Sequence, residues 1–182
     1  GLSAFAGRRL SVNERVYESE LEHAHRNYAI AHMLRGHGIL TGDPTVAVQG
    51  YTPQCSLMGT AKDLALMAAT LANYGVHPVT GEQVVPKTVV RQVLSVMFTC
   101  GMYNAAGDWA TQVGVPAKSG VGGGIIGAVP GQLGVATFSP RLDGHGNSVR
   151  GVELFEQFSD DMGMHVMNVP TVARSALRAN YQ

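Results

Sequence analysis

The sequence has 182 residues, the length of one domain or of a large part of one. Hydrophobic residues make up 45% and charged residues 14%, which predicts a substantial core and excludes a disordered chain. Thirteen basic residues balance thirteen acidic ones, which argues against nucleic acid or a membrane surface as a partner.

No apolar run reaches membrane-spanning length, and the N-terminus does not have the pattern of a signal peptide. The two cysteines, Cys55 and Cys100, do not form a disulfide framework, so we expect buried, reduced thiols and a cytoplasmic location. The opening residues carry no start methionine. We therefore expect the chain to begin partway through a larger protein.

Apolar residues recur at helical spacing from Val12 to Leu34, which predicts one helix over this range. Glu20 and Asn27 are seven residues apart, so on such a helix they share a face about 10 Å apart along the axis. Ala24 lies between them and leaves space. A carboxylate and a carboxamide in this arrangement could hold the ammonium and carboxylate groups of an amino acid. The alternative, two solvated surface residues, is the commoner situation for these residue types.

Three histidines in the same stretch, His23, His25 and His32, lack the His-x-x-x-His spacing with a glutamate. We therefore predict no metal site here.

The middle of the chain predicts turns and then two helices. Asp43-Pro44 indicates a turn, and the segment around Tyr51 to Pro53 is expected to be extended. A stripe of apolar residues predicts a helix that is capped by Ser56 or Thr60 and runs to roughly Tyr74. Pro86 suits the first turn of a further helix, which runs from Lys87 to about Thr99 and delivers Tyr103.

The stretch from Cys100 to Gly124 carries the strongest chemical signal. Tyr103 follows a helix end, and Lys118-Ser119-Gly120 enters a glycine-rich turn on a predicted edge strand. A Lys-Ser/Thr-Gly strand beside a pocket is a component of serine acyl-enzymes. The alternatives are a core tyrosine, a lysine in a surface ion pair and an ordinary hairpin turn.

Two short strands around Pro130-Gly131 are predicted between Ile125 and Phe138. The segments Gly151 to Met162 and Pro170 to Ala179 are expected to be helical. Helices, then a strand meander, then closing helices predict an α+β domain with an antiparallel sheet covered by helices.

Several longer segments resemble the serine-dependent glutaminases, in family order over nearly the whole chain. They are Ser19-Glu20 to Leu34 (SELEHAHRNYAIAHML), Tyr51 to Ser56 (YTPQCS), Met67 to Glu82 (MAATLANYGVHPVTGE), Cys100 to Trp109 (CGMYNAAGDW), Pro116 to Ile125 (PAKSGVGGGI) and Ser139 to Gly151 (SPRLDGHGNSVRG). The resemblance implies a β-lactamase and penicillin-binding-protein-like fold with a mostly helical lobe. It also implies hydrolysis of L-glutamine to L-glutamate and ammonia through a serine acyl-enzyme, without a cofactor.

The resemblance also implies roles for single residues. Glu20, Asn27 and Tyr51 match positions that hold the amino and carboxylate groups of the substrate. Tyr103 matches the tyrosine near the nucleophile that is proposed to shuttle its proton, and Val121 matches the residue whose backbone N–H completes the oxyanion hole. The Lys-Ser-Gly segment takes the place of the Lys-Thr-Gly strand that flanks the pocket.

One departure concerns the nucleophile, which in this family lies in a Ser-x-x-Lys motif. The three lysines, Lys62, Lys87 and Lys118, are preceded at the required position by glycine, valine and valine. We therefore expect the nucleophile to lie upstream of residue 1 and the chain alone to be inactive. The chain would be the C-terminal part of one catalytic domain, with a helical lobe over about 1–112 and strands and closing helices over about 113–182.

The expected partners are L-glutamine or L-glutamate, the N-terminal segment of the same enzyme, and further copies in a dimer or tetramer. Two other functions remain open from the residues: a penicillin-binding or β-lactamase-type acyl-enzyme, and a non-catalytic sensor of glutamine or glutamate.

Overall fold

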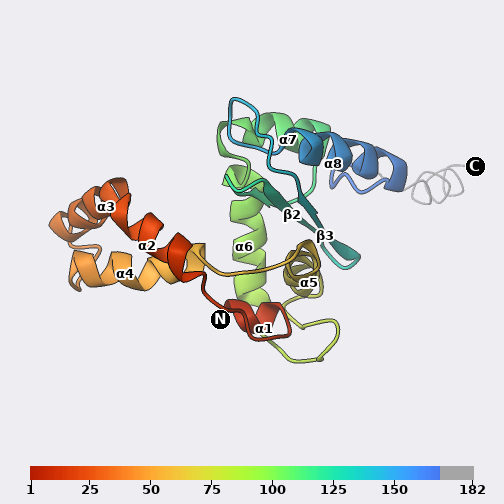
Figure 1. The fold of residues 1–182 in the computed structure, drawn as a ribbon. Coiled ribbons are helices and arrows are strands. Elements are labelled where there is room, and N and C mark those ends of the chain that lie inside the picture. Colours follow the sequence, from red (N-terminus) through yellow and green to blue (C-terminus); the bar gives the residue numbers. More distant parts are fainter. Residues whose placement is uncertain (169–182) are drawn as a thin grey trace, which may run out of the picture. The chain divides into compact units, whose positions relative to one another are not determined.

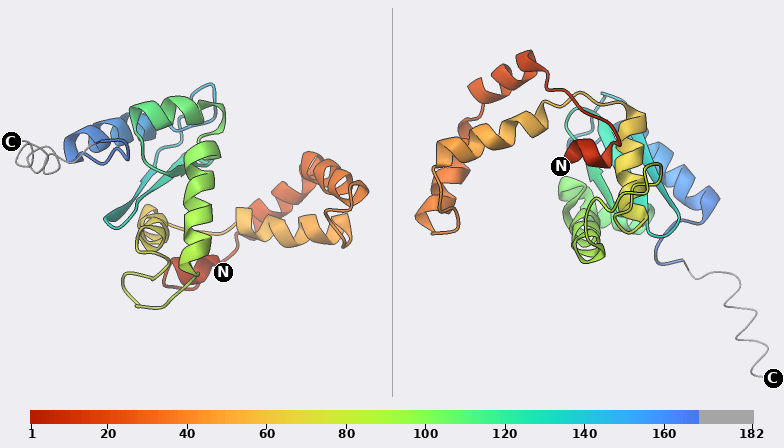
Figure 2. Two further views of the ribbon diagram at one scale, coloured as in Figure 1. Left: turned by 180° about the vertical axis from the view of Figure 1, so that it is seen from behind. Right: turned by 90° about the horizontal axis from the view of Figure 1, so that it is seen from below.

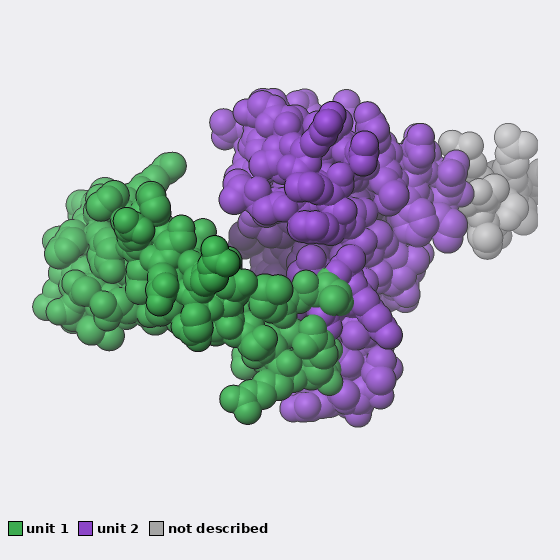
Figure 3. Space-filling model, viewed as in Figure 1, with its two compact units in different colours: residues 1–60 green, residues 61–182 purple. Residues whose placement is uncertain are grey.

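The computed structural model describes residues 1–168, so the predicted helix from Pro170 to Ala179 lies outside the described residues. The chain divides between Thr60 and Ala61 into two compact units, coloured separately in Figure 3. Unit 1 is residues 1–60, and unit 2 begins at Ala61. Each unit is described by itself below.

Unit 1 is helical (Figure 1). Its core contains Ala24, Ala31 and Val48, with Tyr28 and Leu40 packed against them. Its helices are α1 (Leu2–Phe5), α2 (Glu14–Glu22), α3 (His25–Gly36) and α4 (Pro44–Cys55).

The single helix predicted over Val12 to Leu34 was wrong, because the chain breaks between α2 and α3. The N–H of His23 still bonds to the Ser19 carbonyl, and a ring nitrogen of His23 lies 2.8 Å from the same oxygen. The next residue, Ala24, is only 5% exposed and joins the core of unit 1. Burying this small side chain turns the backbone out of α2. Glu20 and Asn27 therefore lie on different helices and do not share one helical face.

The expected turn and extended segment before Ser56 were also wrong, because these residues form α4. The Asp43 carboxylate accepts hydrogen bonds from the N–H groups of Thr45 and Val46, at 2.6 and 3.2 Å, and caps the helix. Pro44 follows in the first turn, where its missing N–H costs nothing. Pro53 falls in the last turn of α4. Tyr51, two residues earlier, is therefore helical and not extended.

Unit 2 combines a three-stranded antiparallel sheet of order β1-β2-β3 with helices (Figure 2). This arrangement confirms the predicted α+β class. The predicted helix after Pro86 and the predicted hairpin at Pro130-Gly131 are also present. The elements are α5 (Ala61–Ala72), α6 (Lys87–Cys100), the 3-10 helix η1 (Tyr103–Ala105), α7 (Ala106–Gln112), β1 (Ala117–Ser119), β2 (Gly124–Val129), β3 (Leu133–Phe138) and α8 (Val149–Met162).

Helices cover both faces of the sheet, and two glycines allow them to lie close. A Cβ on Gly127 would come within 2.6 Å of the Phe155 ring of α8, and one on Gly134 within 2.1 Å of the Ala69 nitrogen of α5. Gly134 pairs with Ala128, the residue after Gly127, so the two glycines face opposite sides of the sheet. The α8 side holds the main core, in which the Trp109 and Phe155 rings lie 5.3 Å apart.

Candidate active site

The end of α6 is fixed against β1 at Gly101. The Gly101 carbonyl accepts the Ser119 N–H at 3.0 Å, and a Cβ on Gly101 would lie 1.7 Å from the Ala117 carbonyl oxygen. Only glycine permits this approach. The contact places Tyr103, two residues further on, directly beside the Lys-Ser-Gly strand.

Tyr103 is held in an uncommon backbone conformation, with φ of 54°. For a residue other than glycine, such a conformation costs on the order of 1–3 kcal/mol and is typical of functional sites. Its hydroxyl donates to the Ser119 carbonyl at 3.2 Å, and the residue is 37% exposed. Tyr103 is therefore not a core tyrosine.

Lys118 reaches the same place from β1. Its ammonium lies 4.6 Å from the centre of the Tyr103 ring and also donates to the Ser119 carbonyl. Partial burial lowers the pKa of Lys118 from its ordinary value. Among the described residues its partners are this ring and this carbonyl rather than a carboxylate, which contradicts the surface ion pair.

The turn after β1 presents Val121. Gly120 donates to the Gly124 carbonyl and Gly123 to the Gly120 carbonyl, both at 2.9 Å, which closes the turn. Val121 is 71% exposed at its tip, and no hydrogen bond between residues of the described range uses its N–H. That N–H is free to bind an anionic oxygen.

Two polar residues behind this cluster are deeply buried. Ser119 and Asn147 are each 1% exposed, and the Ser119 hydroxyl and the Asn147 carbonyl oxygen lack a hydrogen-bond partner within residues 1–168. Asn147 and its neighbour Gly146 were not identified from the sequence. Their segment, Leu142 to Ser148, has the composition of a turn-rich loop, and although it lies in a stretch that resembles the glutaminases, the resemblance assigns no role to either residue.

The remaining predicted substrate residues lie in unit 1. Glu20 is exposed on α2 and lines a hollow of about 380 Å³ together with Asn13 and Arg15. Hydrogen bonding with Cys55, followed by the charge of Cys55, burial and the charge of Glu20, raises the pKa of Tyr51. The structure thus brings Glu20 and Tyr51 near each other. It places Asn27 on the exposed part of α3, without a described contact to either.

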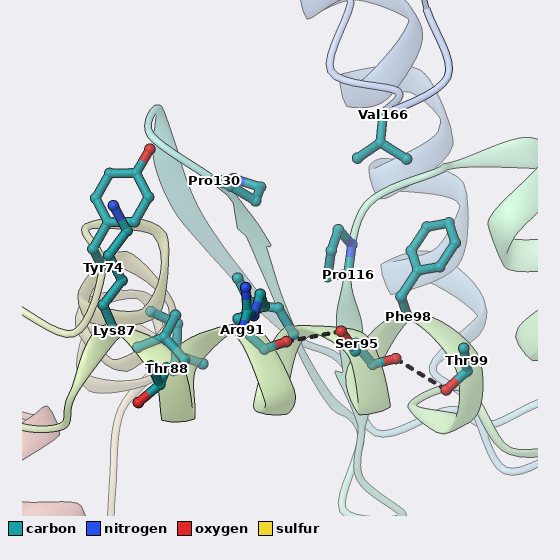
Figure 4. Close-up of a pocket in the computed structure, with 13 residues that line it drawn as sticks. Tyr74, Lys87, Thr88, Arg91, Ser95, Phe98, Thr99, Pro116, Pro130 and Val166 are labelled. Carbon is teal, nitrogen blue, oxygen red and sulfur yellow. Dashed lines mark hydrogen bonds between the residues drawn. The ribbon is translucent and has the colours of Figure 1, made fainter.

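A larger cavity, of about 650 Å³, lies in unit 2 along α6 (Figure 4). Its walls are mainly apolar, with Phe98 and Pro116 among them, and the Lys87 ammonium lies over the Tyr74 ring at one end. None of the predicted site residues lines it. This cavity is separate from the cluster around Tyr103.

Cys55 and Cys100 are both free and exposed, so the prediction that they are buried was wrong. In the part of the chain that the structure describes, no three acidic, histidine or cysteine side chains gather as metal ligands. In the same residues, no helix has the length and apolarity needed to cross a membrane.

A family model described as "Glutaminase" matches residues 1–167. The chain therefore belongs to the glutaminase family, as the sequence motifs predicted. Two curated relatives are the glutaminase of Corynebacterium efficiens, 54% identical over 97% of this chain and 42% of the relative, and Glutaminase 2 of Bradyrhizobium diazoefficiens, 50% identical over 99% of this chain and 29% of the relative. The chain thus spans less than half the length of these relatives.

Solved structures confirm the fold. A crystal structure of Mglu in its glutamate form superposes with a TM-score of 0.89 at 50% identity, over 94% of this chain and 39% of that one. The Bacillus subtilis glutaminase YbgJ, in a covalent complex with 5-oxo-L-norleucine, gives 0.87 at 38% identity, over 91% of this chain and 59% of that one. The chain has the glutaminase, β-lactamase-like fold.

Proposed function

We propose that the protein carrying this chain is a glutaminase that hydrolyses L-glutamine to L-glutamate and ammonia through a serine acyl-enzyme. The observation that carries this proposal is the family match over residues 1–167. The proximity of Lys118 and of the Val121 turn to Tyr103, the residues that the resemblance assigns to the site, supports it. The covalent complex of the Bacillus subtilis enzyme supports a covalent route. The matches to glutaminases favour glutamine over a β-lactam as the substrate.

In this proposal, Tyr103 acts next to the serine. Its hydroxyl carries the nucleophile's proton, and such a proton transfer contributes about 10²–10⁴-fold to a rate. The Lys118 ammonium, over the tyrosine ring, adds positive charge where the substrate oxygen becomes negative. Ser119 and Gly120 complete the strand that flanks the pocket.

Val121 stabilises the transition state through its backbone. The exposed turn presents its N–H without a described partner, which suits an oxyanion hole. A donor of this kind is worth about 3 kcal/mol in the transition state, because charge develops on the oxygen that it binds. A side-chain substitution at Val121 leaves this donor in place, so the role resides in the turn rather than in the valine.

Glu20, Asn27 and Tyr51 recognise the amino-acid end of the substrate. A carboxylate in an exposed hollow, next to a phenol, suits an ammonium group, and a charged hydrogen bond of this type contributes about 1.5–3 kcal/mol. Asn27 supplies a carboxamide for the α-carboxylate from the neighbouring helix.

The chain is, in this proposal, the C-terminal part of a single catalytic domain whose Ser-x-x-Lys motif lies in another segment of the protein. About 1–112 form its mostly helical part, and about 113–182 its strands and closing helices. The protein acts in the cytoplasm as a dimer or tetramer, without a cofactor.

The test uses the whole encoded protein with Tyr103→Phe, and Tyr74→Phe as a matched control. Tyr74 also has a positive φ, of 55°, and also lies under a lysine ammonium, 4.4 Å from its ring centre. We expect Tyr103→Phe to lower glutamine turnover by about 10²-fold or more while glutamate binding persists. The control should behave as wild type.

Wild-type turnover in Tyr103→Phe would refute the role of this hydroxyl. An unsubstituted whole protein that binds glutamate but releases no ammonia from glutamine would refute the enzyme and favour a sensor.

A further inference from the structure

The loop between Leu142 and Ser148 is a self-contained structure. The Asp143 N–H donates to the Asn147 carbonyl at 2.8 Å, and the Asp143 carboxylate accepts the N–H groups of His145 and Asn147 at 2.8 and 2.9 Å. Its end is anchored by Ser148, which is fully buried and caps α8 through the Gly151 N–H at 3.1 Å. Hydrogen bonds within the loop therefore define its conformation, and the buried Ser148 anchors it to unit 2.

This loop lies beside Tyr103 and beside the turn that carries Val121. Gly146 has a φ of 92°, and an added Cβ would lie 3.7 Å from the Tyr103 ring and 3.8 Å from the Val121 side chain. Gly146 thus faces the phenol and the turn that presents the free N–H, and a Cβ there would make ordinary van der Waals contact with both. The position also requires glycine for its backbone conformation.

Asn147 connects the loop to the backbone of Tyr103. Its side-chain amide donates to the Met102 carbonyl at 3.4 Å, across 45 residues of sequence. That carbonyl belongs to the peptide group that joins Met102 to Tyr103, so its direction is coupled to the φ of Tyr103. Two donors meet on this oxygen, the Asn147 amide and the Ala105 N–H at 3.1 Å, and together they hold the uncommon φ of 54° in place.

We propose that the Asp143–Ser148 loop is a positioning element for catalysis, in which Asn147 helps to fix the peptide before Tyr103 and Gly146 faces the Tyr103 ring and the Val121 turn. Asn147 touches neither the reacting atoms nor the substrate in this proposal and acts through Tyr103. Its effect on turnover rests on the proposed function, whereas its effect on the backbone does not.

The experiment compares Asn147→Ala with Asn73→Ala in the whole encoded protein. Asn73 is a control for the loss of such a hydrogen bond, because its amide, on an exposed side chain, also donates to a backbone carbonyl, that of Val76, at 3.0 Å. Hydrogen exchange followed by mass spectrometry reports the peptides around 101–106 and 119–123. We expect exchange there to accelerate by about 10-fold in Asn147→Ala and to stay unchanged in the control.

The same variants are assayed with glutamine. We expect Asn147→Ala to lower kcat by about 10–100-fold with KM nearly unchanged, since small misplacements of a catalytic group have effects of this size. Asn147→Asp keeps the shape of the side chain but cannot donate when ionised, and should resemble the alanine variant. Asp143→Ala loosens the loop from a partly exposed position and should act in the same direction if Asn147→Ala fails to fold.

Unchanged exchange in both peptides in folded Asn147→Ala, or in Asp143→Ala where the former does not fold, would overturn the positioning role whether or not the protein is an enzyme. An equal fall of kcat in Asn147→Ala and Asn73→Ala would overturn it too, because a general loss of stability would then explain both. Absence of turnover in the unsubstituted protein, with exchange accelerated as expected, would count against the glutaminase activity alone.

Discussion

Gly101→Ala tests the contact that fixes the end of α6 against β1. The added methyl group would lie 1.7 Å from the Ala117 carbonyl oxygen, whereas real Cβ contacts are almost never shorter than 3.0 Å. The oxygen belongs to the backbone of a buried strand and cannot rotate away. The helix end and the strand must therefore separate by more than about 1 Å.

The magnitude follows from the interactions that this separation disturbs. Overpacking a rigid site costs about 1–3 kcal/mol, and loss of the hydrogen bond from Ser119 to the Gly101 carbonyl adds about 1 kcal/mol. Alanine recovers up to about 1 kcal/mol, because glycine loses more chain entropy on folding. We expect the free energy of unfolding to fall by about 1–4 kcal/mol, which lowers the Tm by about 2–4 °C per kcal/mol for a chain of this size.

The assay is thermal and urea denaturation followed by tryptophan fluorescence. Trp109 is the single tryptophan of the sequence and is buried in the core of unit 2, so its signal reports the unit that is perturbed. Gly107→Ala is the control, because a Cβ there meets nothing within 4 Å and α7 favours alanine. A Gly101→Ala midpoint equal to that of Gly107→Ala would refute the geometric argument.

Ser159→Ala removes the hydroxyl that donates to the buried Val113 carbonyl at 2.6 Å, so urea denaturation should show a loss of about 1–3 kcal/mol. Gly127→Ala should lower the free energy of unfolding by a similar amount through its clash with Phe155. Phe155→Leu should lower it less when added to Gly127→Ala than when made in the wild-type chain. Burial of Asp143 opposes its ionisation, but hydrogen bonds from backbone N–H groups of its loop hold its pKa below 3.8. Its carboxylate thus stabilises the folded chain above the unfolded pKa and loses this effect as the pH falls through the folded pKa. Asp143→Ala should flatten the decline of Tm between about pH 5 and pH 2.

Elements with strong local signals were predicted well. Pro86 marks the start of α6, which was expected over Lys87 to about Thr99 and runs over Lys87–Cys100. Pro130-Gly131 marks the hairpin of β2 and β3, whose strands are close neighbours in the sequence. In both cases the conformational preferences of proline and glycine at a few neighbouring residues determine where the element begins or turns.

Elements decided by tertiary packing were not predicted. Nothing in the local sequence prevents a helix through Ala24, and its burial against Ala31 and Val48 is what turns the chain there. Asp43-Pro44 fits both a turn and a helix start, and the extended segment expected around Pro53 is helical because a helix tolerates this proline in the last turn of α4.

The candidate site divides in the same way. The motif around Tyr103 and Lys118 could be found in the sequence because its residue types carry the chemistry. Asn147 could not, because its contribution is one hydrogen bond to a carbonyl 45 positions away, and the resemblance of its segment to the glutaminases gives this residue no role. Supporting residues of this kind require the structure.

The distribution of site residues between the two units predicts how substitutions should separate. Glu20 and Tyr51 lie on helices of unit 1, whereas Tyr103 and Lys118 are held by the sheet and α6 of unit 2. Each set is positioned by the core of its own unit, so a change in one set leaves the local geometry of the other intact. In the proposed glutaminase, Glu20→Gln should therefore raise KM for glutamine, because a carboxylate that binds the ammonium acts in ground state and transition state alike. Tyr103→Phe should lower kcat, because its hydroxyl acts while the proton moves. The opposite result would be a change of only kcat in Glu20→Gln and of only KM in Tyr103→Phe. It would mean that recognition and proton transfer are not divided between the units in this way.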